Sequence, residues 1–487
     1  MCPYVGDMRT LVWFRGKDLR LADHAPLTSA INRGGDVVPL FVVDDFFFAP
    51  ERAQQLPHRM QFLLQSLASL QHNIEALGSR LLLVRGRSTD VVPQVVRDWS
   101  IDKVVAHRWS EPLGRERDRR VQEALSVPFQ LMEGEMLVPP ETVRTGAGQP
   151  FSVFTPFKRR LLADLDVGAP LPAPKALAPL PADLVDEGTA TLPTMDELGL
   201  TKNALVLEGG ERAARARMRT FLETAGEAYD ERRNSMDDPA GTSRLSADLK
   251  FGTLSIRTLW QASVKVLGDT EGADVFRNEL LWREFALHTL WDRPELLKAP
   301  FKETFVGFPW RDDAKAWEAW CTGHTGYPVV DAAARQLLAE GFVHNRARMI
   351  AASFLTKHLM LNYRLGEAHY MQHLTDGDWA ANNLGWQWAA GCGCDAQPYF
   401  RVFNPMTQGQ KFDVSGAYVR KWVPELAKLP TKHLHAPWQA KPDVLQAAGV
   451  TLGETYPEPI VDHKEARERF LSTAKAHLAH ASALKSR

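Results

Sequence analysis

The sequence predicts two structural classes in one chain: an α/β domain on a parallel sheet at the N-terminus, followed by an all-α domain. Two patterns support this prediction. Short apolar runs alternate with amphipathic segments up to about residue 135, which is typical of buried strands covered by helices on both faces. After about residue 205, long stretches with helical apolar spacing dominate. A chain of 487 residues, 45% of them hydrophobic, can bury a core in each of two domains.

In the first domain, the predicted strands are the apolar runs 10–14, 37–43, 81–84 and 103–106. Segments 57–77 and 88–99 have helical spacing and are the predicted covering helices. Strands that alternate with helices in this way predict a Rossmann-like, doubly wound parallel sheet. No G-x-G-x-x-G follows the first strand, so we do not expect a nicotinamide dinucleotide there.

A segment rich in Pro, Ala and Leu separates the two halves. It runs from 168 to 200 and contains APLPAPKALAPLPADL, which predicts an extended linker. We therefore place the α/β domain at 1–135, the interdomain linker at 136–205 and the helical domain at 206–487. The segment 329–361 shows the helical pattern of the last domain clearly.

Composition limits the classes of partner. With a formal net charge of -1, no global basic field attracts nucleic acid, so any DNA contact requires a local patch. The four cysteines are too few for a disulfide framework, and C-x-C at Cys392 and Cys394 lacks a second pair, so we expect no metal. No apolar run approaches the roughly 20 residues needed to cross a bilayer. We expect a cytoplasmic protein without membrane contact.

Two short segments could bind ligands. The residues GTSRLS, 241–246, would present hydroxyls and an arginine to a phosphate at a helix start, although Ser and Thr are also ordinary N-caps. Glu279 and Trp282 are three apart and share a helix face, which suits a planar hydrogen-bonding ligand. A surface Glu beside a core Trp fits the same pattern.

A third segment, GFVHNRARM, places Asn345 and Met349 four apart on one helix face, while Arg346 and Arg348 point elsewhere. One helix could therefore serve a polar pocket and an ion pair, and a solvated arginine face is the alternative.

The segment from Asp376 to Asp413 interleaves acids, amides and indoles. Asp376 and Asp378 supply fewer oxygen ligands than a hard-cation site requires. The alternation of tryptophans with Asn382 and Asn383 instead favours an aromatic planar cofactor.

The motifs GTSRLS, ELLWREF, TGYPVVDAAARQL, HNRARM, DGDWAANN and WQWAAG occur in this order. With them the chain resembles the DNA photolyase and cryptochrome family over nearly its whole length, and its pattern is most similar to a bacterial class I type cyclobutane pyrimidine dimer photolyase. The resemblance implies an N-terminal antenna domain, a long connecting segment and a helical domain that binds FAD.

The resemblance implies a set of FAD-binding residues. Tyr229, Thr242, Ser243, Arg244, Leu245 and Ser246 would contact the phosphates, Arg283 would lie along the cofactor, Arg348 and Asp376 would pair beside the isoalloxazine, Asp378 would hold the ribityl or adenine side, and Asn382 would face flavin N5. A second antenna chromophore, methenyltetrahydrofolate or a deazaflavin, is also typical of the family. Lys298 fits a folate pattern, whereas Leu113, Gly114 and Leu297 replace the polar residues of many folate-binding members.

The implied activity is light-driven, redox-neutral repair of cyclobutane pyrimidine dimers in DNA by electron transfer from excited FADH⁻. The lesion pocket would contain Glu279, Trp282, Asn345, Met349 and Trp388, and Arg233, Arg346, Arg401 and Lys411 would contact phosphates. Members that act on the (6-4) photoproduct have histidine where this chain has Met349. The alternative within the family is a cryptochrome photoreceptor with little repair. We expect a monomer with no obligate protein partner.

For photoreduction, the family's electron carriers would correspond to Trp386, Tyr363 and Trp310. The family usually has tryptophan at the middle position. Because tyrosine must shed a proton when it is oxidised, we expect photoreduction to be slower or to pass through an extra indole such as Trp379.

Overall fold

The computed structural model describes residues 8–188 and 190–485, which form two compact units. Unit 1 comprises residues up to Phe151, Thr155–Glu227 and Ser243–Pro294; unit 2 comprises Ser152–Phe154, Ala228–Thr242 and the chain from Glu295 onward. The predicted helical domain, 206–487, is thus distributed over both units. The domain boundaries themselves stay a prediction.

Unit 1 is an α/β structure built on five parallel strands in the order β3-β2-β1-β4-β5. Its strands are β1 (Arg9–Phe14), β2 (Asp36–Val43), β3 (Leu82–Arg85), β4 (Lys103–His107) and β5 (Phe129–Met132). Its helices are α1 (Ala25–Arg33), α2 (Pro50–Gln54), α3 (Pro57–Ala76), α4 (Ser88–Asp98), α5 (Pro112–Ala124), α6 (Phe154–Ala163, all but its first residue), α7 (Glu211–Thr224), α9 (Ser246–Phe251), α10 (Ile256–Leu267) and α11 (Glu271–Asp292).

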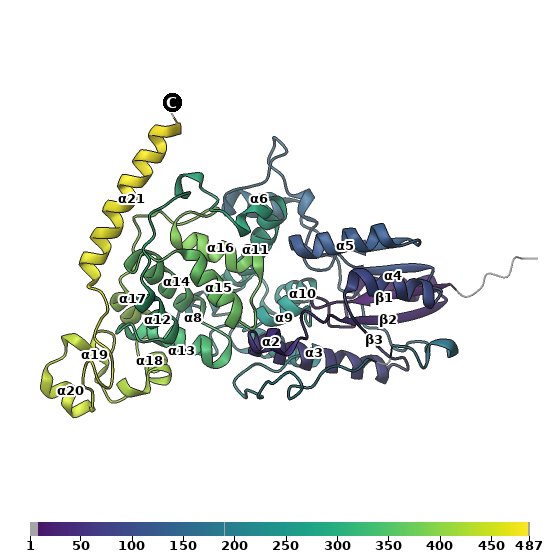
Figure 1. Ribbon diagram of the computed structural model, residues 1–487, viewed down its shortest axis with the longest axis horizontal. Helices are drawn as coiled ribbons and strands as arrows, with labels where there is room; N and C mark the ends of the chain where they lie inside the picture. Colours follow the sequence, from purple (N-terminus) through teal and green to yellow (C-terminus); the bar gives the residue numbers. More distant parts are fainter. Residues whose placement is uncertain (1–7, 189, 486–487) are drawn as a thin grey trace, which may run out of the picture. The chain divides into compact units, whose positions relative to one another are not determined.

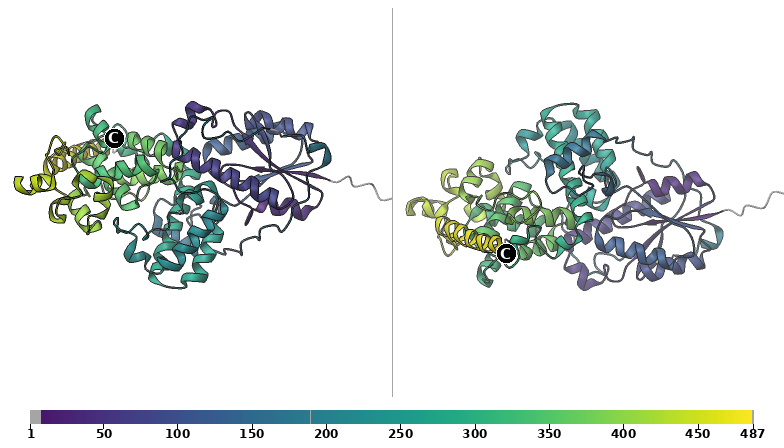
Figure 2. Two further views of the ribbon diagram at one scale, coloured as in Figure 1. Left: turned by 90° about the horizontal axis from the view of Figure 1, so that it is seen from below. Right: turned by 90° about the horizontal axis from the view of Figure 1, so that it is seen from above.

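Both faces of the sheet are buried, which explains why the strands read as continuous apolar runs. Along β1, Val12 and Phe14 pack into one cluster with α1 and α3, whereas Leu11 and Trp13 pack into a second cluster with α4. Successive side chains of a strand point to opposite faces, so helices on both sides are needed to cover them. Figure 2 shows the strands between helices on both sides. The predicted doubly wound sheet is confirmed.

The linker runs along the surface of unit 1 and protects an edge of the sheet. Leu83 of the edge strand β3 donates to Gly188 O at 3.2 Å and accepts from Ala190 N at 3.2 Å. These bonds occupy backbone groups that an edge strand would otherwise leave open to pairing with another chain. Besides a 3₁₀ turn at Ala182–Leu184 and turns at 185–186 and 195–199, the described residues of the segment form no helix or strand.

Unit 2 is helical, and an isolated bridge between Leu452 and Tyr456 is the extent of its β structure among the described residues. Its helices (Figure 1) are α8 (Tyr229–Arg232), α12 (Ala314–Thr322), α13 (Pro328–Glu340), α14 (Asn345–Ser353), the π-helical turn η5 (Phe354–His358), α15 (Tyr363–His373), α16 (Trp379–Ala390), α17 (Pro405–Phe412), α18 (Ala417–Trp422), α19 (Thr431–Leu434), α20 (Pro442–Ala448) and α21 (His463–Lys485). Its short 3₁₀ helices are η3 (Pro294–Leu297, all but its first residue), η4 (Glu303–Phe305), η6 (Pro424–Leu426) and η7 (Pro437–Gln439), whereas η1 (Pro140–Thr142) belongs to unit 1.

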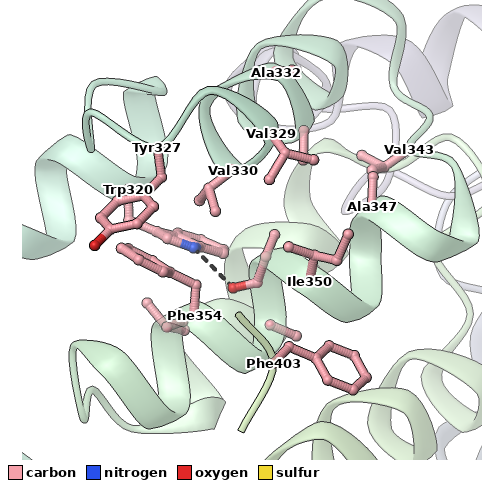
Figure 3. Packing of buried hydrophobic residues seen from close by; sticks show 14 of the residues in the cluster. Trp320, Tyr327, Val329, Val330, Ala332, Val343, Ala347, Ile350, Phe354 and Phe403 are labelled. Carbon is pink, nitrogen blue, oxygen red and sulfur yellow. Dashed lines mark hydrogen bonds between the residues drawn. The ribbon is translucent and has the colours of Figure 1, made fainter. Parts of the chain in front are cut away.

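Part of the core of unit 2 lies between α12, α13 and α14. Figure 3 shows Val330 and Tyr327 of the α13 region facing Phe354 and Ile350, with Trp320 beside them. The Trp320 indole N–H donates to Ala351 O at 3.1 Å, which satisfies its polar atom inside the core.

Two local sequence signals define α16. Asp378 is its N-cap, and its carboxylate accepts from Ala380 N and Ala381 N, both at 3.0 Å. Gly391 ends the helix with φ of 88°, a left-handed conformation that favours glycine. Among the described residues, no helix is long and apolar enough to span a membrane.

Candidate functional site

Helix α14 presents a polar contact at its first turn. Asn345 Nδ2 approaches Met349 Sδ to 3.9 Å, so the two side chains share a face as their spacing predicts. Asn345 is exposed and Met349 is half-buried. His344 caps the helix by accepting from Arg346 N, and burial, together with the neighbouring arginines, lowers the pKa of His344 to about 4, so the cap is neutral at physiological pH.

Another face of α14 carries an ion pair. Arg348 Nη2 lies 2.9 Å from Asp376 Oδ2 and 3.2 Å from Oδ1, and its Nε donates to Val343 O at 2.8 Å. The pair joins α14 to the loop that precedes α16. The expected pairing of Arg348 with Asp376 is therefore present, whereas its place beside a flavin stays a prediction.

Two adjacent amides of α16 are oriented by Glu367 of α15. Asn382 Nδ2 donates to Glu367 O at 2.9 Å, and Asn383 Nδ2 donates to Glu367 Oε1 at 2.8 Å. Burial raises the pKa of the Glu367 carboxyl. The Asn382 amide nitrogen donates to Glu367 of α15. Its Oδ1 is therefore the atom suited to accept a hydrogen bond from a ligand N–H.

Trp386 is buried in an aromatic group of unit 2. Its ring centroid lies 5.2 Å from that of Tyr370 and 6.0 Å from that of Trp320. Tyr363 lies 6.4 Å from Trp310, so these two predicted carriers are in contact. Within the described residues, the ring contacts of Trp386 do not include Tyr363.

Trp320 was not predicted as a member of this site. It contacts Trp386 and also stacks on Trp317, with centroids 5.6 Å apart. The W-x-x-W spacing of α12 is a signal for two indoles on one face, but it predicts core packing equally well. Trp388, the predicted lesion-side indole, is half-buried against the same core.

Basic side chains gather in unit 2. Arg346 Nη2 donates to Asn234 Oδ1 at 2.6 Å, and its guanidinium lies 4.2 Å from the Phe412 ring. Burial, then the nearby charges of Arg233 and Arg401, lower the pKa of Arg346. Lys411 lies beside the same Phe412 ring, at 5.3 Å. The structure thus brings together the four predicted phosphate-binding residues.

The other predicted lesion residues lie on α11 of unit 1. Glu279 and Trp282 are half-buried, and Trp282 contacts the Phe285 ring at 5.8 Å. Arg283 Nη1 donates to Glu135 O at 2.8 Å, which fixes the arginine against the segment after β5.

The GTSRLS segment does not act as an ordinary N-cap. The cap position of α9 is Leu245, which has no side-chain capping bond, and Ser243 Oγ accepts from Leu245 N at 3.4 Å in a local turn. Arg244 adopts a left-handed backbone with φ of 52°. The capping alternative therefore does not describe this segment, and phosphate binding stays a prediction. Tyr229 begins α8, with Arg233 over its ring at 6.0 Å.

The residues considered for the antenna have mixed environments. Leu113 is 74% exposed, Lys298 is exposed, and Gly114 packs so closely on the Trp109 ring that a Cβ would overlap it. The Trp109 ring also lies 4.3 Å from the Arg117 guanidinium. These contacts leave the second chromophore a prediction.

Asp18, His24 and His107 form a buried group at the carboxyl edge of the sheet that has metal-like composition. His24 Nδ1 accepts from Leu27 N at 3.1 Å, so its Nε2 carries the proton and is not free to bind a metal. Burial lowers the pKa of His107 to about 3, and its Nδ1 lies 3.3 Å from Asp18 Oδ2. The group is best explained as a carboxylate hydrogen-bonded to His107, with the His24 Nε2 atom 3.7 Å away.

The chain is similar to known proteins over nearly its whole length. Residues 10–175 match the DNA photolyase family and residues 276–476 match the FAD binding domain of DNA photolyase. A deoxyribodipyrimidine photo-lyase from Agrobacterium fabrum is 40% identical over 474 residues, covering 96% of this chain and 97% of the relative. That from Escherichia coli is 38% identical over 488 residues, covering 96% and 98%.

Solved structures show the same fold. A bacterial class III photolyase from Agrobacterium tumefaciens superposes with a TM-score of 0.89 at 38% identity, covering 98% of this chain and 99% of that one. A cryptochrome from Synechocystis superposes with a TM-score of 0.87 at 29% identity, covering 96% and 99%. The predicted fold class and the resemblance are therefore confirmed, and the chain belongs to the DNA photolyase family, with an FAD-binding domain in its C-terminal part.

Proposed function

We propose that this enzyme repairs cyclobutane pyrimidine dimers in DNA by light-driven, redox-neutral electron transfer from reduced FAD. The supporting observation is that different faces of α14 carry different contacts. One helix carries the Asn345–Met349 face, the Arg348–Asp376 ion pair and the basic Arg346. Lesion, cofactor and DNA contacts on a single rigid element would keep these ligands in fixed register.

The residues present fit FAD. The hydroxyls of Thr242 and Ser243 are not used to cap α9, so they can donate to phosphate oxygens together with Arg244. Asn382 Oδ1 can accept from the ring N–H at flavin N5, and the Arg348–Asp376 pair would hold the ring plane. Bound FAD supplies the electron that splits the cyclobutane ring and takes it back afterwards. Electron supply would begin at Trp386 and continue through Tyr363 and Trp310 or through a neighbouring indole.

The chain's own task is to hold the lesion. A dimer inside a duplex must be flipped out before it can approach the cofactor, at a cost of a few kcal/mol that the lesion's distortion reduces. Trp282, Trp388 and Met349 would form apolar walls around it. Glu279 and Asn345 would hydrogen-bond the pyrimidine carbonyl and imide groups.

The DNA backbone would be bound by the basic cluster of Arg233, Arg346, Arg401 and Lys411. Because the formal net charge is only -1, this local cluster, rather than the overall field, would provide the attraction. We place the enzyme in the cytoplasm as a monomer that needs no protein partner, with a folate or deazaflavin as the second chromophore.

Light-dependent restoration of thymine is the direct test. The purified protein is reduced, bound to an oligonucleotide that contains a thymine dimer and illuminated with blue or near-UV light. Recovery of thymine absorbance is expected in light and not in darkness. No recovery would contradict the proposal and favour the alternative, a cryptochrome photoreceptor, to which the likeness with the Synechocystis structure lends support.

A further inference from the structure

Lys357 is completely buried in unit 2, on the π-helical turn η5 that continues α14. Its Nζ donates to Arg401 O at 2.8 Å. Among the described residues, no carboxylate pairs with this amine. A lysine in such a place is unusual because burying a cation without an opposite charge is unfavourable.

The surroundings of Lys357 make the cation unfavourable. Burial, then the charge of Arg401, lower the pKa of Lys357 to about 7, while the neighbouring Cys392 thiol acts weakly in the opposite direction. The aromatic ring of Phe470 lies 5.9 Å away. An apolar side chain of similar length at this position would destabilise the fold less than lysine does. Stability therefore does not explain the presence of lysine.

The carbonyl that Lys357 holds lies in a partly exposed segment. Phe403 of this segment is buried, and Tyr399 and Val402 are half-buried against the core. Residues 398–403 connect two anchored points: Gln397 Nε2 donates to Ala389 O at 3.1 Å, and Asn404 caps α17 by accepting from Met406 N at 3.0 Å. Between these points, Phe400 is 61% exposed and Arg401 is exposed. Lys357 gives this stretch an attachment to the core at the Arg401 carbonyl.

The position of η5 explains why its Lys357 can reach the Arg401 carbonyl. The π-helical turn follows α14 directly, from Asn345–Ser353 to Phe354–His358, and π-turns are frequent at functional sites because the extra residue redirects a side chain. The helix that carries Asn345 and Arg346 thus also fixes Arg401.

We propose that Lys357 is a positioning residue for DNA binding, which fixes the Arg401 backbone so that the Arg401 guanidinium meets a phosphate in register with the residues of α14. This inference rests on the proposed DNA contact of Arg401. It assigns Lys357 no contact with DNA, lesion or cofactor.

The test compares Lys357→Met, which removes the donor, with Lys357→Gln, which keeps a neutral one. Binding of the FAD-loaded protein to dimer-containing duplex is measured over a range of salt concentrations. For Lys357→Met we expect the Kd to rise about tenfold and the slope of log Kd against log salt to fall by about one, as when one phosphate contact is lost. Lys357→Gln should stay near wild type.

A second measurement separates positioning from folding. The thermal midpoint and FAD content of Lys357→Met should not fall, since a buried cation has been removed. A fall in midpoint and FAD content that parallels the loss of DNA affinity would overturn the inference in favour of a structural role. Lys428→Met, an exposed lysine of the same unit, is the control for the lost charge.

Arg401→Ala distinguishes this inference from the proposed function. If Arg401→Ala leaves DNA binding unchanged, both the proposed phosphate contact and this inference are wrong. If Arg401→Ala weakens binding and Lys357→Met does not, the inference alone is wrong. In the double variant, the two effects should be less than additive, because both act on the same contact.

Discussion

Neighbouring positions on α14 direct their side chains to different contacts. Asn345 and Met349 are one turn apart and touch, whereas Arg346 is directed to Asn234 and Arg348 to Asp376. Substitutions at neighbouring residues should therefore affect different functions. This independence allows the proposed roles to be tested one residue at a time.

Glu279 is the residue whose loss should affect repair without affecting FAD. Glu279→Ala removes the proposed hydrogen bond to the dimer, and we expect kcat/KM for repair to fall about tenfold or more. Recovery of thymine absorbance under light measures the change, and FAD absorbance shows retention of the cofactor. Glu279→Gln, whose amide can donate a hydrogen bond to the dimer, should retain more activity. Loss of FAD from the alanine variant would show that Glu279 is misplaced in our proposal.

Glu284 should make the stability of unit 1 depend on pH. It is fully buried on α11, and burial raises its pKa to about 7, although Arg283 opposes this shift. In the folded state the group holds its proton between about pH 4.5 and 7, where the unfolded chain has lost it. The stability it contributes is thus full at low pH and is lost as the pH rises through 7.

Chemical denaturation at several pH values measures this effect. The free energy of unfolding of the wild type should fall between pH 5 and 8, and Glu284→Gln, which cannot ionise, should fall less. In the wild type, Leu137 N donates to Glu284 Oε2 at 3.0 Å. In the glutamine variant, the side-chain amide oxygen can still accept this hydrogen bond in part. Identical pH profiles for the two proteins would exclude Glu284 as the titrating group.

At the scale of elements, the predicted strands were confirmed because strands buried on both faces read as apolar runs. β5 was missed, since its four residues Phe129–Met132 are only partly buried and give no such run. The helix 57–77 was confirmed as Pro57–Ala76. The π-turn η5 has no sequence signature, because an added residue in a helix changes hydrogen bonding without changing composition.

Spacing could also predict contacts within one helix but not between elements. The Asn345–Met349 contact followed from their four-residue separation. The pairing of Arg348 with Asp376, 28 residues away, came only from family resemblance. The contact of Trp386 with Trp320 was not predicted, because it depends on how α12 and α16 pack.

The packing of α15 on α16 depends on a glycine. A Cβ at Gly366 would overlap the Trp386 ring and come within 2.7 Å of Leu355. Gly366→Ala should therefore displace the indole and lower the free energy of unfolding by about 1–3 kcal/mol, as overpacking does. Denaturant unfolding and tryptophan fluorescence measure both effects.

Gly385 of α16 is the matched control. An added Cβ there meets nothing within 4 Å, so Gly385→Ala should be neutral or stabilising by up to about 1 kcal/mol through helix propensity. If both alanine variants have the same stability, close packing against Gly366 does not position Trp386.

For the whole molecule, the proposed DNA binding would depend on balanced overall charge and a local basic cluster. The chain has 58 basic and 59 acidic side chains, so long-range attraction is weak and non-specific binding should be poor. In the proposed function, affinity would then come from the few cations of unit 2 and from the lesion pocket. Dimer-containing DNA should consequently be preferred strongly over undamaged duplex.

Salt dependence tests this distribution of binding energy. If Arg233, Arg346, Arg401 and Lys411 each neutralise one phosphate, log Kd should rise with log salt with a slope of about 3 to 4, near 0.9 per contact. Lys411→Ala should lower that slope by about one and weaken dimer-containing and undamaged duplexes by the same factor, because a phosphate contact carries no lesion information. Asn345→Ala should do the opposite, with an unchanged slope and a loss confined to dimer-containing DNA. A slope near zero in the wild type would remove the basic cluster from the DNA interface and leave recognition to the pocket alone.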